Sequence, residues 1–570
     1  MTPYRIGALV LAAVTFAAGC ASAGPVRTSA PPSSSTGAQA VAGPKRIVTA
    51  ILGNPYTLSQ EINTAGTGSI RGVGEAEKLI HAGLVIRDGD GNLRPKMAEA
   101  VPTIDNGNWR LMPDGRMETS WTIKQGAMWH DGTPFTSADL VFTLAVGMDK
   151  QLALPGYPGY KLLEGMEAVD DRTVTVRWRE PFIDADTLFS PEFLMPRPRH
   201  ILEQAYLNDK GAYLELPYWT VQYVGLGPFK LREFVRDSHM TVEAFDKHIG
   251  GRPKLDQIEI RFIQDPNALI ANVMAGEIEL TIGRGFNVDQ IAPIAAQWTN
   301  GRMESSPSNW IAHYPQLLTP NPAVIGDARF RRALLHALDR KTMSDQLQDG
   351  QAPVADVWLE LGDPYYKDVE PRVVKYPFDP RQAASVIEGL GYTKGGDGFY
   401  RDATGQRLSI ESRTNAGDDV KEKIILASAD YWQRVGIGVD TVLTPRQQAS
   451  DREYRATMPG FDLVRQPFEP ERIVSSEAAL PENRFSGKNR TRYMNPEMDG
   501  YVHAYLTTIP IAPRIDALAK IMHLMTQDAV ALGVFYAPEP RLIANRLVNV
   551  AATKNSVSDE TWNAEQWDVR

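Results

Sequence analysis

The chain has 570 residues, of which 43% are hydrophobic and 23% are charged, and its net charge is −9. This composition is typical of a globular protein, and the acidic balance excludes a nucleic-acid partner, which requires a basic face. The length allows several domains, and a single cysteine excludes an internal disulfide framework.

Residues 1–19 have the layout of a secretory signal. Arg5 follows the amino terminus, residues 6–16 are almost wholly apolar, and the small residues 17–19 lead to Cys20. The apolar run is too short to cross a bilayer as a helix. The end of this run, Ala-Ala-Gly-Cys, resembles a bacterial lipobox, with alanine where leucine is more usual. We therefore expect removal of residues 1–19 and lipid attachment at Cys20; the alternative is an ordinary signal peptide.

The segment after the cysteine has a different composition. Residues 21–44 are mostly Ala, Ser, Thr, Gly and Pro, and they show no apolar periodicity. Such a segment buries too little surface to offset the entropy of ordering it. We expect residues 20–44 to form a flexible tether between the lipid and a folded body.

The first elements of the folded body are a helix and a hairpin. Residues 76–84 place Leu79, Ile80 and Leu84 on one apolar side, which predicts a short helix. Residues 85–93 carry two Asp-Gly pairs between apolar residues, which is the pattern of a hairpin.

A strand and a capped helix follow. Trp121 and Ile123 alternate with polar residues, which predicts a half-buried strand within residues 117–129. Thr136 then precedes an apolar helical stripe, and Asp139 follows three residues later, which is the pattern of a capping box.

Motifs that carry catalysis are missing from the sequence. It contains no glycine-rich phosphate loop, no His-Glu-x-x-His and no Gly-x-Ser-x-Gly, and its nine histidines have no metal-ligand spacing. We therefore expect no enzyme activity, no cofactor and no metal site. An exported enzyme that uses a pair of carboxylates is the remaining alternative.

Several blocks, in a fixed order, closely resemble the family 5 solute-binding proteins, which are the dipeptide-, oligopeptide- and nickel-binding lipoproteins of ABC importers. The most specific are His130-Asp-Gly-Thr-Pro-Phe-Thr-Ser-Ala-Asp-Leu-Val-Phe142 and the segment 327–340, and the resemblance extends over about residues 46–550. Within these blocks we expect Gly132 to set a turn. Asp327, Arg331 and Asp339 should cap helices or pair charges.

The resemblance implies an α/β fold of the periplasmic-binding-protein kind, type II, with two lobes, a ligand cleft between them and an extra subdomain. The first lobe would comprise residues 45–67, 180–283 and 532–570. The inserted subdomain would comprise residues 68–179, and the second lobe residues 284–531.

The function implied is that of a substrate-binding lipoprotein. It would capture a short peptide or similar small solute by lobe closure and deliver it to the permease and ATPase subunits of an importer, as a monomer anchored outside the cell membrane. A sensor lipoprotein without transport remains an alternative, and so does a binding protein for an oligosaccharide or a metal chelate.

The expected ligand residues lie mainly in the stretch Phe461-Asp-Leu-Val-Arg-Gln-Pro-Phe-Glu-Pro-Glu-Arg472. Peptide-binding relatives commonly use an acidic side chain in the corresponding loop for the peptide amine, so Glu469 and Glu471 are candidate counter-charges. Arg465 and Phe468 are candidate contacts in the same stretch. The alternative for the glutamates is a solvated run of charges. Trp310 is a fifth candidate: it would face the cleft or pack in the core.

Overall fold

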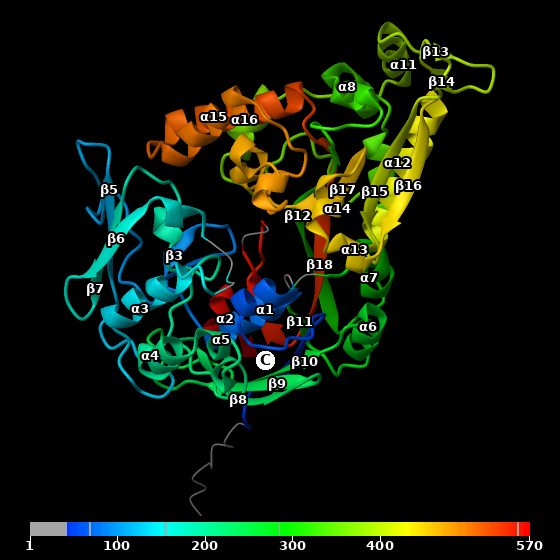
Figure 1. Cartoon of the computed structure of the whole chain (residues 1–570). Helices are drawn as coiled ribbons and strands as arrows, with labels where there is room; N and C mark the ends of the chain where they lie inside the picture. Colours follow the sequence, from blue (N-terminus) through cyan, green and yellow to red (C-terminus); the bar gives the residue numbers. More distant parts are fainter. Residues whose placement is uncertain (1–42, 68–69, 153, 155–156, 284, 556–557) are drawn as a thin grey trace, which may run out of the picture. The chain divides into compact units, whose positions relative to one another are not determined.

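A ten-stranded mixed sheet is the main element of the computed structural model, which describes residues 43–570 except 68–69, 153, 155–156, 284 and 556–557 (Figure 1). Cys20 and the predicted signal and tether up to residue 42 lie outside the described residues. In their order across the sheet the strands are β16 (Gly438–Thr444), β15 (Ser409–Asn415), β17 (Phe461–Gln466), β12 (Gly301–Pro315), β18 (Leu532–Ala544), β11 (Leu280–Thr281), β1 (Arg46–Ile51), β10 (Gln257–Phe262), β9 (His239–Ala244) and β8 (Phe229–Val235).

Two long strands join the halves of this sheet. β12 and β18 pair antiparallel from Gly301 opposite Ala544 to His313 opposite Leu532, and the register shifts between Pro307 and Trp310 and again between Ile311 and Ala312. We call the part around β1 and β8–β11 the first lobe, the part around β15–β17 the second lobe, and the β12–β18 pair the junction.

The first lobe also includes helices. They are α1 (Gln60–Thr67), α2 (Val73–Ile80), α6 (Pro266–Met274) and α7 (Val288–Ala295). Ile291 of α7 packs in one apolar cluster with Ala50 of β1 and Leu269 of α6. The first-lobe core also includes Trp567, close to the carboxyl terminus, beside β19 (Leu547–Val548), η9 (Glu560–Gln566) and β20 (Asp568–Val569).

The predicted helix at residues 76–84 is α2, but it ends at Ile80. His81 is extended (φ −139°, ψ 160°), and its ring bonds the backbone of Pro196 and Leu226. Leu84 donates its N–H to the Phe189 carbonyl at 2.8 Å. The prediction was therefore wrong at its carboxyl end, because tertiary contacts replace the last helical turn.

A separate four-stranded antiparallel sheet consists of β4 (Trp109–Leu111), β5 (Met117–Thr122), β7 (Thr173–Trp178) and β6 (Leu163–Ala168), and α3 (Ser137–Gly147) packs on it. We use the name inserted subdomain for the part of the chain that contains this sheet, α3 and the hairpin before it. The predicted hairpin is confirmed as β2 (Val85–Arg87) and β3 (Leu93–Pro95), and β5 confirms the strand that contains Trp121. The capping box is also confirmed, since the Thr136 N–H donates to the Asp139 carboxylate at 2.9 Å at the start of α3.

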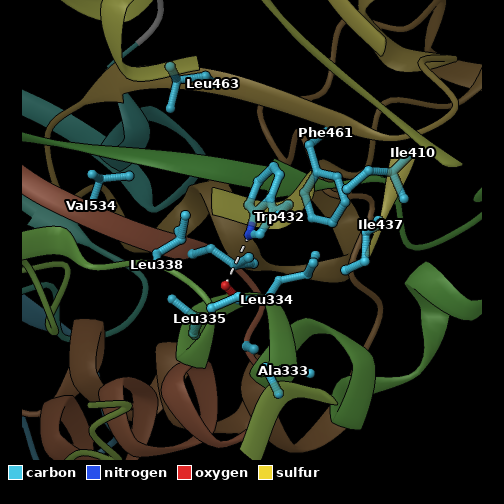
Figure 2. Packing of buried hydrophobic residues seen from close by; sticks show 14 of the residues in the cluster. Ala333, Leu334, Leu335, Leu338, Ile410, Trp432, Ile437, Phe461, Leu463 and Val534 are labelled. Carbon is cyan, nitrogen blue, oxygen red and sulfur yellow. Dashed lines mark hydrogen bonds between the residues drawn. The ribbon is translucent and has the colours of Figure 1, made fainter. Parts of the chain in front are cut away.

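The second lobe has a large apolar core between its strands and helices (Figure 2). At its centre Trp432 of α12 (Asp419–Val435) is fully buried beside Phe461, and its Nε1–H donates to the Leu334 carbonyl at 3.0 Å. Leu334 lies in the last turn of α8 (Ala328–His336), so this bond satisfies a carbonyl at the end of that helix.

The predicted capping residues of this lobe are confirmed. Asp327 accepts from the Arg329 N–H at 2.8 Å at the start of α8, and Asp339 accepts from the Thr342 N–H at 3.0 Å at the start of α9 (Arg340–Leu347). Arg331 donates to the Asp528 and Ala529 carbonyls just past the end of α16 (Ile511–Gln527).

Shorter elements connect these parts. The remaining helices and strands are α4 (Arg199–Asn208), α5 (Lys210–Tyr213), α10 (Tyr366–Val369), α11 (Pro380–Gly389), α13 (Arg446–Ala449), α14 (Arg452–Ala456), α15 (Pro496–Thr507), β13 (Thr393–Lys394) and β14 (Tyr400–Arg401). The 3-10 turns are η1 (Pro158–Lys161), η2 (Ala185–Thr187), η3 (Pro217–Trp219), η4 (Ala323–Gly326), η5 (Glu370–Arg372), η6 (Pro470–Ile473), η7 (Ser475–Glu477) and η8 (Pro481–Asn483). Within the described ranges, no helix combines the length and apolar character needed to cross a bilayer.

Candidate functional site

A cavity of about 440 Å³ is bordered by both lobes and the junction. We call it the interlobe cavity. Its walls come from α6 and the segment before α7 on one side, from the start of α12 and the end of β17 on the other, and from β18. The lining residues are Arg71, Asp265, Pro266, Asn267, Gly285, Asn287, Gln290, Gly417, Asp418, Asp419, Arg465 and Glu539.

Three helices begin at this cavity. Asp265 caps α6 by accepting from the Ala268 N–H at 2.7 Å, Asn287 caps α7, and Asp418 caps α12 by accepting from the Lys421 N–H at 3.3 Å. Side-chain oxygens are the preferred caps because the first N–H groups of a helix lack intrahelical partners. The positive potential at the amino termini of three helices therefore acts on this site, and the capping carboxylates of Asp265 and Asp418 offset part of it.

Arg465 lies between two carboxylates of the interlobe cavity. One of its terminal nitrogens is 3.5 Å from Glu539 Oε1 on β18, and the other is 3.9 Å from Asp418 Oδ1. Burial works to raise the pKa of Asp418, but the charges of Arg465 and Lys421 outweigh it, so this pKa lies below its usual range. Within the described part of the chain, the buried Nε–H of Arg465 has no acceptor. Arg465 therefore keeps one hydrogen-bond donor that no described residue satisfies.

A second cavity, of about 240 Å³, adjoins α2 in the first lobe and shares Arg71 with the interlobe cavity. We call it the α2 cavity. Glu77 is held there by the Gln60 N–H at 2.8 Å and the Tyr223 hydroxyl at 3.1 Å. Glu75 also lines the cavity, and burial, followed by the charges of Asp559 and Glu560, raises its pKa to about 7. A carboxyl in this state can gain a proton or a cationic partner near neutral pH.

The lobes also meet at a contact distant in sequence from the junction. The Ile183 N–H donates to the Leu506 carbonyl of α15 at 2.9 Å, and Lys161 Nζ is 3.5 Å from Glu477 Oε1. We call this the rim contact. Asp186 follows Ile183 by three residues in the chain.

The pKa of Asp186 is raised to about 7. Burial is the main cause and the charge of Asp184 the next, while Arg87 and Arg514 partly oppose the rise. Since Arg87 belongs to the inserted subdomain and Arg514 to the second lobe, this carboxyl is affected by charges from both sides of the rim contact.

The structure places the predicted charged residues in two different surroundings. Arg465 lines the interlobe cavity. Glu469 precedes η6 and pairs with Arg472 at 2.7 Å, so it already has a counter-charge. Glu471 is half-buried, and burial raises its pKa, as does the charge of Asp184 across the rim contact. Neither glutamate is among the described residues that line the interlobe cavity.

The predicted aromatic residues lie in the core of the second lobe. Trp310 is only 4% exposed, is stacked on Trp358 at 5.9 Å between ring centroids, and donates its Nε1–H to the Tyr314 hydroxyl at 2.8 Å. Phe468 packs edge-on against Trp358 at 5.4 Å and is half-buried. Trp310 thus takes the core position that was the alternative to a cleft role.

Sequence reasoning missed most residues of the cavities. Gly417-Asp418-Asp419 follows a strand and precedes a helix, so the capping role of Asp418 was readable from the sequence. The position of Asp418 opposite Arg71 and Asp265 could not be read from the sequence. Those residues are far away in the chain, and the order of the sheet strands brings them near Asp418. Glu75 gave no signal beyond an acidic residue in the first turn of a helix.

Comparison with known proteins gives one consistent result. The sequence model of the bacterial extracellular solute-binding proteins, family 5, matches residues 93–467. The oligopeptide-binding protein AppA of Bacillus subtilis is 26% identical over 435 residues, which cover 75% of each chain.

Two solved structures share the fold. The oligopeptide-binding protein of Thermus thermophilus, complexed with a pentapeptide, is 23% identical, has a TM-score of 0.73 and covers 92% of this chain and 96% of its own. NikA of Brucella suis, in complex with Fe(III)-EDTA, is 18% identical, has a TM-score of 0.72 and covers 92% of this chain and 100% of its own.

Proposed function

The chain belongs to the bacterial extracellular solute-binding proteins, family 5, and from this premise we propose that it captures a short peptide or a similar small solute for an ABC importer. The permease and ATPase subunits of that importer would be its partners. Members of the family are exported binding proteins. Lipid attachment at Cys20, the tether at residues 20–44 and a monomeric state are further parts of the proposal.

The interlobe cavity is the observation that carries this proposal. Its charged groups come from the first lobe (Arg71, Asp265), the second lobe (Asp418, Arg465) and the junction (Glu539). A solute in this cavity makes its full set of contacts only when the lobes are close together. Binding therefore shifts the population toward the closed form, and a permease can recognise that form.

The ligand class is supported by both the relatives and the charges. AppA of Bacillus subtilis is named for oligopeptides, and the Thermus structure contains a pentapeptide. A peptide carries an amine and a carboxylate. Arg465 offers a cation with an unsatisfied donor for the carboxylate, and Glu75 offers a carboxyl for the amine, with Lys78 as a competing cation. Glu469 and Glu471 remain predicted counter-charges, with Arg472 as a competitor for Glu469.

Binding without chemistry is the simplest mechanism for such a site. The cavity groups neutralise and orient a solute, and no bond has to be made or broken. A metal chelate is the second ligand class, since the NikA structure contains one. The described residues that line the interlobe cavity include no histidine, and this favours the peptide.

The test is to identify the solute that co-purifies with the protein and to titrate it back. We expect mass spectrometry of the denatured protein to release a small peptide. Small-angle scattering should then show a smaller radius of gyration when that peptide is added to the emptied protein. An unchanged radius at saturation would contradict lobe closure, and turnover of the peptide would indicate an enzyme instead.

A further inference from the structure

A third cavity, of about 270 Å³, is lined by five cationic side chains of the second lobe and, among the described residues, by no carboxylate. We call it the basic cavity. The cations are Arg452 and Arg455 from α14, Arg472 from η6, and Lys488 and Arg490 from the segment after η8. Bringing five like charges to one cavity is unfavourable unless an anion offsets them.

Two of the five cations have protein counter-ions. Arg472 pairs with Glu469 at 2.7 Å, and Arg490 pairs with Asp462 of β17 at 3.0 Å. The Nε–H of Arg472 is nevertheless buried and has no acceptor in the part of the chain that the structure describes. The pairs therefore neutralise two charges and still leave a hydrogen-bond donor unsatisfied at the cavity.

The other three cations have no carboxylate within ion-pair distance among the described residues. In the described ranges, Arg452, Arg455 and Lys488 form no ion pair and no side-chain hydrogen bond. Arg455 is half-buried, and its pKa is lowered first by burial and then by the charge of Arg490, while the charges of Asp462 and Asp451 partly oppose this. The lining thus keeps an excess of three positive charges.

Hydrogen bonds of a buried side chain fix the segment that carries Lys488 and Arg490. Asn489 between them is fully buried, and its amide donates to the Val474 carbonyl at 3.0 Å and to the Tyr493 carbonyl at 2.8 Å. Fixing the backbone there orients both cations before any ligand arrives. Such preorganisation lowers the entropy lost on binding.

The basic cavity is on the side of the second lobe that meets the first. Lys488 is close enough to Glu471 to lower its pKa, and Asp184 of the first lobe raises the pKa of that same carboxyl. Lys421 of α12 also lies near both cavities, because its pKa is affected by the charges of Asp418 and Arg465 and by those of Asp462 and Arg490. An anionic arm of a solute in the cleft therefore has this cavity beside it.

We propose that the basic cavity binds a group with at least two negative charges, either a phosphate ester or a pair of carboxylates, on the transported solute. This rests on the proposed function. A single carboxylate, as at the end of an ordinary peptide, offsets only one of the three excess charges. A dianion offsets two and also supplies several acceptors for guanidinium donors.

The first experiment uses simple anions, so that it does not depend on lobe closure. Calorimetry at constant ionic strength and about pH 8 compares inorganic phosphate, succinate and acetate. We expect phosphate or succinate to bind at least about tenfold more tightly than acetate, and the better of the two identifies the source of the dianion. Equal binding of all three anions would overturn the proposal.

Variants locate the binding. Arg455→Gln combined with Lys488→Gln should weaken dianion binding at least about tenfold, because two of the excess charges are removed. Arg381→Gln is the matched control, since Arg381 is exposed on α11 and outside the cavity. Thermal unfolding of each variant verifies that it is folded. Unchanged dianion affinity in the folded double variant would refute the proposed site, whereas a peptide that compacts the protein would still support the proposed function.

Discussion

Replacing Asp186 by Asn should change how the stability of the protein depends on pH. The pKa of this carboxyl rises from 3.8 to about 7, chiefly through burial at the rim contact. A carboxyl with a raised folded-state pKa stabilises the fold fully only below its unfolded pKa, and this stabilisation is lost as the pH rises through the folded pKa. The contribution of Asp186 is therefore present below about pH 4 and absent above about pH 7.

The raised pKa of Asp186 also gives the size of the expected difference in the free energy of unfolding. A pKa about three pH units above its usual value corresponds to about 4 kcal/mol for a fully buried group. Asp186 keeps part of its surface in contact with solvent, so about half of that, about 2 kcal/mol, is the realistic expectation. Asp186→Asn removes the charge and should therefore be more stable than the parent by about 2 kcal/mol at about pH 8, and nearly equal to it at about pH 4.5.

Equilibrium urea unfolding of the two proteins at both pH values measures this difference. Asp105→Asn is the control, because Asp105 is an exposed carboxylate of the neighbouring inserted subdomain and keeps its contact with water. Scattering at both pH values would show whether the rim contact opens as the carboxyl ionises. If the free-energy difference between Asp186→Asn and the parent were the same at both pH values, the reasoning from burial would be refuted.

Three further predictions concern the cavity, the core and the anchor. Arg465→Gln should weaken solute binding by about 2–5 kcal/mol in calorimetry, because it removes a cation and its hydrogen-bond donors from the interlobe cavity. Arg381→Gln should have no effect, and equal losses in the two variants would contradict a local role. Trp432→Phe should lower the free energy of unfolding by about 2 kcal/mol, because the hydrogen bond to the Leu334 carbonyl is lost and the ring is smaller. Equilibrium urea unfolding measures this change, and an unchanged midpoint of unfolding would show that the bond contributes nothing. Cys20→Ala should release the protein from the membrane fraction, and a variant that was processed normally and stayed in that fraction would exclude the lipid anchor.

The features that the sequence predicted well are those that depend on neighbouring residues. The Asp-Gly turn between β2 and β3, the Thr136–Asp139 capping box and the caps at Asp327 and Asp339 each involve groups a few residues apart. Their geometry depends on the local backbone, so a pattern of residue types is enough to predict them.

The candidate site was harder to predict because it depends on the order of strands in the sheet. Glu469 and Arg472 are three residues apart and pair locally, a contact that helical spacing alone would suggest. By contrast, the pKa of Glu75 is raised first by burial and then by the charge of Asp559, almost at the other end of the chain. The excess charge of the basic cavity likewise depends on which carboxylates reach it, and no sequence pattern records this.

The junction of β12 and β18 constrains how the two lobes can move. The strands pair along most of their length, so a rotation of one lobe has to bend both together. The register shifts between Pro307 and Trp310 and between Ile311 and Ala312 interrupt the regular ladder there. If the two strands bend together, their ladder hydrogen bonds are kept. If one strand slides past the other, those bonds break, so bending is the easier motion. Solutes of different length would then close the protein along one path, and a permease could accept them all by recognising a single shape.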